Sequence, residues 1–179
     1  MTPKTAARHR VLGLDPGSRV MGYAVLERLE RGRFTYRECG TIAASARAPI
    51  AERLLELATG LREVIHELAP TEAAMEDIFT HRNAHSALVL GQARGAALLV
   101  LTEQGLTVTG YPPATVKKTV CGNGRAAKEQ VQQMVTALTG LKHPPAEDAA
   151  DALAVAICHC LHAATPELLR QTHKKGGRR

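Results

Sequence analysis

The chain has 179 residues, of which 45% are apolar and 22% charged, as is typical of one globular domain. Its 23 basic and 17 acidic side chains give a formal net charge of +6, which is compatible with a polyanionic partner but does not require one. No apolar run reaches 18 residues, no signal-peptide pattern opens the chain and no C-x-x-C pair occurs, so we expect a cytoplasmic protein without a membrane span, a disulfide framework or a zinc site.

The first half of the chain predicts three strands, a helix and a further short strand. Two apolar runs separated by the turn sequence PGSR form a hairpin, and a segment of alternating character follows. Apolar residues then recur at helical spacing until a proline ends the pattern. We expect strands at 11–16, about 20–27 and 34–42, a helix at 50–68 and a strand of about five residues within 71–79.

The second half predicts four helices and one strand. They are expected at 83 to about 104 (helix), 106–111 (strand), 112 to about 120 (helix), around 131–138 (helix) and within 143–161 (helix). The order βββαβαβααα favours one α/β domain, a mixed sheet with helices on its faces. We expect the folded domain to span residues 10–163, with flexible basic termini at 1–9 and 164–179.

Two carboxylates stand where apolar strands end or cross the predicted core. Asp15 directly follows the run VLGL and precedes a Pro-Gly turn, and Glu76 stands inside AAMEDIF. Both have an ordinary alternative, since Asp15 could accept hydrogen bonds within its turn and Glu76 could face solvent. Because side chains alternate along a strand, Asp77 points to the opposite face from Glu76.

A second pair of acids lies near the start of the last predicted helix. Asp148 and Asp151 are three residues apart, so they share one face of an alanine-rich helix. The helix dipole could account for them, but the small alanines also allow a close approach to the sheet. If all four acids converged, they would suit Mg²⁺ or Mn²⁺ rather than zinc, and two such ions would support phosphodiester hydrolysis by an activated water.

Four stretches of the chain closely resemble the RuvC family of bacterial Holliday-junction resolvases. In order, they are GLDPGSRVMGYAV, MEDIF with NAHSALVLGQARGAA, VKKTVCGNGRAAKEQVQQMV and AEDAADALAVAICH. The resemblance covers about residues 11–162. It implies a ribonuclease H-like fold with five strands. It also implies a homodimer that nicks two opposing strands of four-way DNA junctions, leaving 5′-phosphate ends, in recombination and repair. The implied cofactor is Mg²⁺ or Mn²⁺, and the implied partner is the RuvA–RuvB branch-migration complex.

The resemblance also assigns roles to individual residues. The family's four acidic positions fall on Asp15, Glu76, Asp148 and Asp151. Lys117 and Lys128 match basic residues near the scissile DNA, and Lys128 would stabilise charge that develops in the reaction. Phe79 matches an aromatic residue that contacts bases, although it could also be a core residue at a strand end. Further DNA contacts are expected from Arg82, Lys118 and Arg125, any of which could instead be solvated surface charge.

Within 83–104, the small residues Gly91, Ala93 and Gly95 resemble the close-packing face of the family's dimer helix. Three other classes share part of the pattern. ATPases of the actin and hexokinase type have a similar first phosphate loop, but they need a second such domain. A catalytically inactive DNA-binding protein would not need all four acids, and the related YqgF group is disfavoured by LGQARG and DAADALA.

Overall fold

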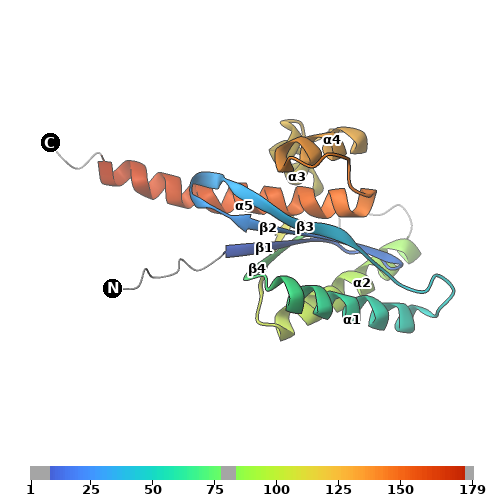
Figure 1. The fold of residues 1–179 in the computed structure, drawn as a ribbon. Helices are drawn as coiled ribbons and strands as arrows, with labels where there is room; N and C mark the ends of the chain where they lie inside the picture. The colour runs from blue at the N-terminus through green and yellow to red at the C-terminus, as the bar shows by residue number, and fades with distance from the viewer. Residues whose placement is uncertain (1–8, 78–83, 176–179) are drawn as a thin grey trace.

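The computed structural model describes residues 9–77 and 84–175, with side chains up to residue 163. The elements follow the predicted order, with one short 3-10 turn added between the second and third strands (Figure 1). They are β1 (His9–Asp15), β2 (Val20–Arg28), η1 (Glu30–Gly32), β3 (Phe34–Ala43), α1 (Ile50–Leu68), β4 (Glu72–Glu76), α2 (Ala84–Glu103), β5 (Thr107–Tyr111), α3 (Pro113–Cys121), α4 (Lys128–Thr139) and α5 (Glu147–Lys175).

The five strands form one mixed sheet in the order β3-β2-β1-β4-β5, which confirms the predicted fold class. β2 pairs antiparallel with β1 and β3, whereas β4 pairs parallel with β1 and β5. Parallel neighbours need crossover connections, and α1 and α2 provide them. The carboxyl ends of β1 and β4 therefore meet at the same edge of the sheet.

Helices cover both faces of this sheet (Figure 1). α1 and α2 pack on one face, and α5 lies along the other, with α3 and α4 on its outer side. Alternation along β1 divides its side chains between two cores, because Leu12 and Leu14 join α1 and α2 while Val11 joins α5. Asp15 continues the odd-numbered set, so its side chain is directed to the α5 side.

Two glycines bring α5 directly onto the strands. A Cβ atom at Gly22 would lie 1.9 Å from the carbonyl oxygen of Asp148, and one at Gly13 would lie 2.3 Å from that of Ala152. Neither position has room for a side chain, so the helix backbone rests on the strand backbone. Because Gly22 pairs with Asp15 across β1 and β2, this contact brings the start of α5 beside the end of β1.

Two helix boundaries differ from the sequence-based expectation. α4 begins at Lys128, three residues before the predicted start, where the backbone N–H of Ala127 donates to Oε1 of Gln130 over 3.0 Å. Alanine is a poor N-cap residue, so the usual start signal is absent from the sequence. α5 begins at Glu147, after the two prolines, and continues to Lys175. The domain boundary at residue 163 stays a prediction.

Within the described residues, α2 is the one helix whose length and composition would suit a membrane span. Length and composition alone do not identify a membrane span, because core helices of water-soluble proteins can be equally long and apolar. α2 buries Ala93, Ala97, Val100 and Leu101, three of which join the core shared with α1 and the sheet. Leu88 and Leu99 on this helix are exposed, so part of its apolar surface faces outward.

Candidate active site

Three of the predicted acidic residues line one cavity at the edge of the sheet. Asp15 ends β1, Glu76 ends the parallel strand β4, and Asp151 comes from the second turn of α5. The cavity has a volume of about 280 Å³. Its lining also includes Pro113, Val116, Lys117, Lys128, Val131 and Ala154. Three elements that are far apart in the sequence thus supply carboxylates to one space, with a lysine from each of α3 and α4.

The charge of Asp15 is poorly compensated in this setting. Burial is the main cause that raises the pKa of Asp15 from 3.8 to about 7, and the negative charges of Asp151, Glu76 and Asp148 contribute to the same shift, in that order of effect. Lys128 opposes this shift with the smallest contribution. Additional positive charge beside this carboxylate would therefore favour its ionised form at neutral pH.

Glu76 and Asp151 show the same imbalance. Burial is the main cause of a raised pKa at both groups. Repulsion by Asp151 adds to the effect at Glu76, whereas Lys117 and Lys128 lower the pKa of both carboxyls. The two lysines thus stabilise part of the negative charge and leave the cavity with an excess of it.

Asp148 lies beside this cavity and is not among its lining residues. Its backbone packs on Gly22, and its charge contributes to the raised pKa of Asp15. Of the four predicted acids, the structure therefore brings three together around one space and places the fourth close enough to interact electrostatically.

The donors of this cavity suit a hard divalent cation. They are carboxylate oxygens only, which favour Mg²⁺ or Mn²⁺ over zinc, and their half-buried charges are under-compensated. Across the described residues, no group of three or more acidic, histidine or cysteine side chains is arranged to hold a metal ion as it stands. Because the carboxylates repel one another, drawing them around a common point requires a compensating cation.

Lys128 has a partner that the sequence did not suggest. It is the first residue of α4, and its ammonium forms an ion pair with Glu147 at the start of α5. Its Nζ atom also lies 4.0 Å from Oδ2 of Asp151. In the sequence, only the position of Glu147 beside Asp148, in the first turn of the predicted helix, indicated that its carboxylate could lie near the predicted acids. The pair ties α4 to the acidic end of α5.

The remaining predicted DNA contacts lie outside the cavity or outside the described residues. Lys118 on α3 and Arg125 in the loop before α4 are exposed and do not line the cavity. Phe79 and Arg82 fall within 78–83, which the structure does not describe. Their roles therefore stay predictions.

Asp77 is separated from the cavity, as strand alternation predicts. Its carboxylate binds Arg94 of α2, with Oδ1 2.8 Å from Nη2. The backbone N–H of Asp77 donates to the carbonyl oxygen of Tyr111 over 2.8 Å and continues the β4–β5 pairing. Glu76 and Asp77 thus have different environments, because Glu76 faces α5 and Asp77 contacts α2.

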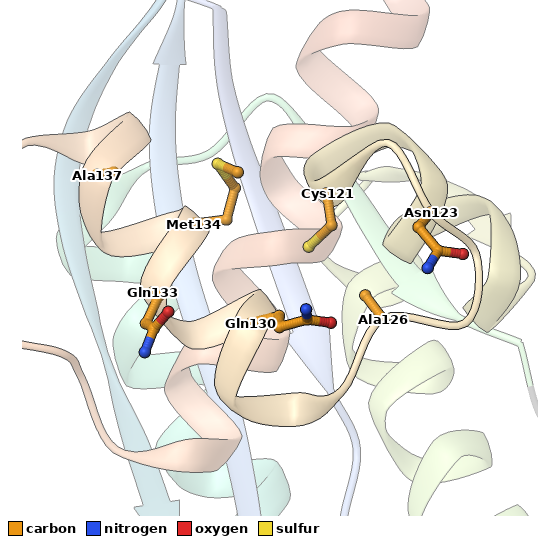
Figure 2. Close-up of a pocket in the computed structure, with 7 residues that line it drawn as sticks. All are labelled: Cys121, Asn123, Ala126, Gln130, Gln133, Met134 and Ala137. Atoms are coloured by element: carbon orange, nitrogen blue, oxygen red, sulfur yellow. The ribbon is translucent and has the colours of Figure 1, made fainter.

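A larger cavity, of about 420 Å³, lies between the end of α3 and α4 (Figure 2). Its lining consists of Cys121, Asn123, Ala126, Gln130, Gln133, Met134 and Ala137. None of these side chains carries a formal charge at neutral pH, so this space has neither carboxylates to balance a divalent cation nor cationic groups to bind a phosphate. Of these two cavities the acidic one is the smaller, and its chemistry makes it the candidate active site.

The topology and the acids together define a class of protein. A mixed sheet with carboxylates at the ends of two adjacent parallel strands and on the covering helix is the arrangement of ribonuclease H-like nucleases. A structure of the yeast mitochondrial Holliday junction resolvase Ydc2 shares this fold, with a TM-score of 0.67 and 14% identity over 94% of this chain and 84% of that one. The predicted ribonuclease H-like fold is confirmed.

The chain belongs to the RuvC family, because the sequence model of crossover junction endodeoxyribonuclease RuvC matches residues 11–159. Similar relatives include RuvC from Halorhodospira halophila, 49% identical over 157 residues, which cover 88% of this chain and 93% of the relative. RuvC from Azorhizobium caulinodans is 49% identical over 161 residues, which cover 90% and 95% of the two chains.

A solved structure of T. thermophilus RuvC in complex with a Holliday junction substrate superimposes with a TM-score of 0.82 and 33% identity. The match covers 88% of this chain and 96% of that one. The chain is therefore a crossover junction endodeoxyribonuclease, a Holliday-junction resolvase of DNA recombination and repair, in a family that is generally metal-dependent.

Proposed function

We propose that this enzyme nicks two opposing strands of a four-way DNA junction symmetrically, using a divalent cation held by Asp15, Glu76, Asp148 and Asp151. The observation that supports this most strongly is the single half-buried cavity lined by three of these carboxylates and two lysines. Its excess negative charge suits Mg²⁺ or Mn²⁺, two ions to each site. Such ions, when bound, would lower the pKa of an attacking water and stabilise the leaving oxygen of the phosphodiester.

The protein's own residues would position the substrate and balance its charge. Lys128 stands at the cavity within reach of Asp151, where it would bind the scissile phosphate and stabilise charge that develops on it. Lys117 would assist from α3. Lys118 and Arg125, which are exposed nearby, would bind neighbouring phosphates, and Phe79 and Arg82 would contact the DNA at the junction.

We infer that the enzyme acts as a homodimer joined through α2. Leu88 and Leu99 are 63% and 60% exposed on this helix, and Cβ atoms at Gly91 and Gly95 would meet nothing within 4 Å. An open apolar face with small residues allows a second helix to approach closely. Two subunits would provide two cavities for two opposing strands. The RuvA–RuvB complex is the proposed partner, and the cytoplasm is the proposed compartment.

The proposal is tested with synthetic four-way junctions whose core sequence is fixed in each substrate and varied between substrates. Nicking is followed on each labelled strand in Mg²⁺ and, separately, in Mn²⁺. We expect paired nicks on opposing strands, ends that a ligase rejoins directly, and no nicking in EDTA. Linear duplex DNA and an RNA–DNA hybrid are the controls, and equal cleavage of either control would identify a general nuclease instead.

A further inference from the structure

A third cavity lies on the other face of the sheet, close to the turn that follows Asp15. It has a volume of about 310 Å³ and opens between the β1–β2 turn and the first turns of α1 and α2. Its polar lining comes from Ser18, Arg19, Arg53, His85 and Ser86. Two guanidinium groups and two hydroxyl-bearing side chains meet there with no carboxylate in the lining, which is the composition of an anion site.

Arg53 carries a positive charge that the described residues leave partly unsatisfied. Its side chain lines the cavity, and its Nε atom is buried without a hydrogen-bond acceptor among the described residues. A buried donor without an acceptor costs about 1–3 kcal/mol, and a guanidinium cannot lose its proton to avoid that cost. The nearby carboxylate of Glu56 accepts a hydrogen bond from the backbone N–H of Ser45 and is not part of the lining.

The position of the cavity favours one source for the anion. Ser18 and Arg19 lie three and four residues beyond Asp15 on the same turn, so this cavity and the acidic one share an edge of the sheet. The first turn of α2, which contributes His85 and Ser86, begins the helix proposed for the dimer contact. DNA that reaches from one acidic cavity toward the partner subunit would therefore pass this turn.

We propose that this cavity binds a backbone phosphate of the junction other than the scissile one, with Arg53 and Arg19 as its cationic ligands. Ser18 adds a hydroxyl donor, and the dipole of α2 favours negative charge at the same point. The inference rests on the proposed action on four-way junctions and adds a positioning site to it. Arg53 and Arg19 would strengthen substrate binding and take no part in the chemical step.

The test compares Arg53→Gln and Arg19→Gln with the control Arg33→Gln. Arg33 is exposed beside η1, at the opposite end of β2 from the acidic cavity, so the control removes the same charge away from the site. Junction affinity is measured in EDTA over a range of salt concentrations. We expect each test variant to bind about 5- to 10-fold more weakly than the control and to lower the slope of log affinity against log salt by about one per subunit.

Nicking at saturating junction should stay within about twofold of wild type, because neither arginine touches the acidic cavity. Affinities and salt slopes equal to those of Arg33→Gln would overturn the inference. If wild type itself neither binds nor nicks four-way junctions, the proposed function fails instead. Arg19 is exposed on a turn, so its variant keeps the test valid if Arg53→Gln does not fold.

Inorganic phosphate distinguishes the two sources of the anion. If millimolar phosphate raises the Tm of wild type but not of Arg53→Gln, while both proteins bind junctions equally well, the cavity is a site for free phosphate and the DNA assignment is wrong. If the variants bind junctions more weakly as expected, competition by phosphate at high concentration only confirms the shared chemistry.

Discussion

At the scale of single residues, Asp15 shows why a functional carboxylate is hard to identify from its own surroundings. From the sequence, Asp15 could accept hydrogen bonds within its turn as readily as it could bind a metal ion. In the structure its side chain lines a cavity with Glu76 and Asp151, and burial together with their repulsion raises its pKa to about 7. Only the meeting of three distant segments distinguishes the two interpretations.

The buried side chain of His159 helps to hold the strand that carries Glu76. At the start of β4, Oε2 of Glu72 lies 3.2 Å from Nε2 of His159 on α5, and Nδ1 of that ring lies 3.0 Å from the hydroxyl of Tyr111. Arg28 adds a weaker contact, 3.5 Å from the same carboxylate. This cluster joins β4, β5 and α5 at the start of β4, whereas Glu76 of the acidic cavity lies at the end of the same strand.

The Glu72 cluster predicts a pH dependence of stability. The close contact with the ring of His159 is the main cause of a lowered pKa at Glu72, so the stabilisation is present above pH 4.5 and is lost as pH falls through the lowered value. Glu72→Gln should reduce the free energy of unfolding by roughly 2 kcal/mol at pH 7, and the difference should shrink below about pH 4. Urea unfolding at several pH values measures this.

The matched control is Glu103→Gln, which removes a half-exposed ion pair with Arg62. That change should cost less than about 1 kcal/mol at any pH. A constant difference between Glu72→Gln and wild type from pH 3 to pH 7 would contradict the assigned role.

At the scale of elements, the contact between α5 and the β1–β2 pair positions the acids. Gly22→Ala would place a methyl group against the backbone of Asp148, where the present separation leaves no room. We expect the free energy of unfolding to fall by about 1–3 kcal/mol and nicking by about 10-fold or more, because the helix must shift away from Asp15.

Thr41→Ala is the control for this change, since Thr41 pairs with Gly22 across β2 and β3 and is exposed. It should leave nicking within about twofold of wild type. If Gly22→Ala lost stability but kept full nicking, the distance between α5 and β1 would not matter for the reaction.

The elements also show what the sequence could and could not predict. Strand alternation and helical spacing predict every strand and α-helix and the mixed sheet but miss η1, and proline and glycine mark most of the ends. The start of α4 is missed because its cap, formed by Gln130, uses an unusual N-cap residue. The pair of Lys128 and Glu147 is missed because it joins two helices whose relative position depends on tertiary packing.

At the scale of the whole molecule, the exposed apolar face of α2 predicts a dimer. Leu88→Glu combined with Leu99→Glu should shift the protein to a monomer, because four buried charges would have to be desolvated across the two subunits. Sedimentation measures the state with and without junction DNA. The double variant should also bind junctions more weakly.

Leu55→Glu is the control, since Leu55 is 65% exposed but lies on α1. It should leave the sedimentation behaviour unchanged. A wild-type protein that stays monomeric when bound to a junction would contradict the proposed assembly.

We propose that Asp15 and its neighbouring carboxylates carry the cleavage step while other residues bind the DNA. Asp15→Asn is assayed on a synthetic four-way junction in Mg²⁺ and compared with Asp77→Asn. Asp77 directly follows Glu76 and binds Arg94 on the other face of the sheet. We expect Asp15→Asn to bind the junction about as tightly as wild type and to nick it at least about 10³-fold more slowly, while Asp77→Asn nicks within a few-fold of wild type. Nicking by Asp15→Asn at the wild-type rate would show that Asp15 does not take part in the cleavage step.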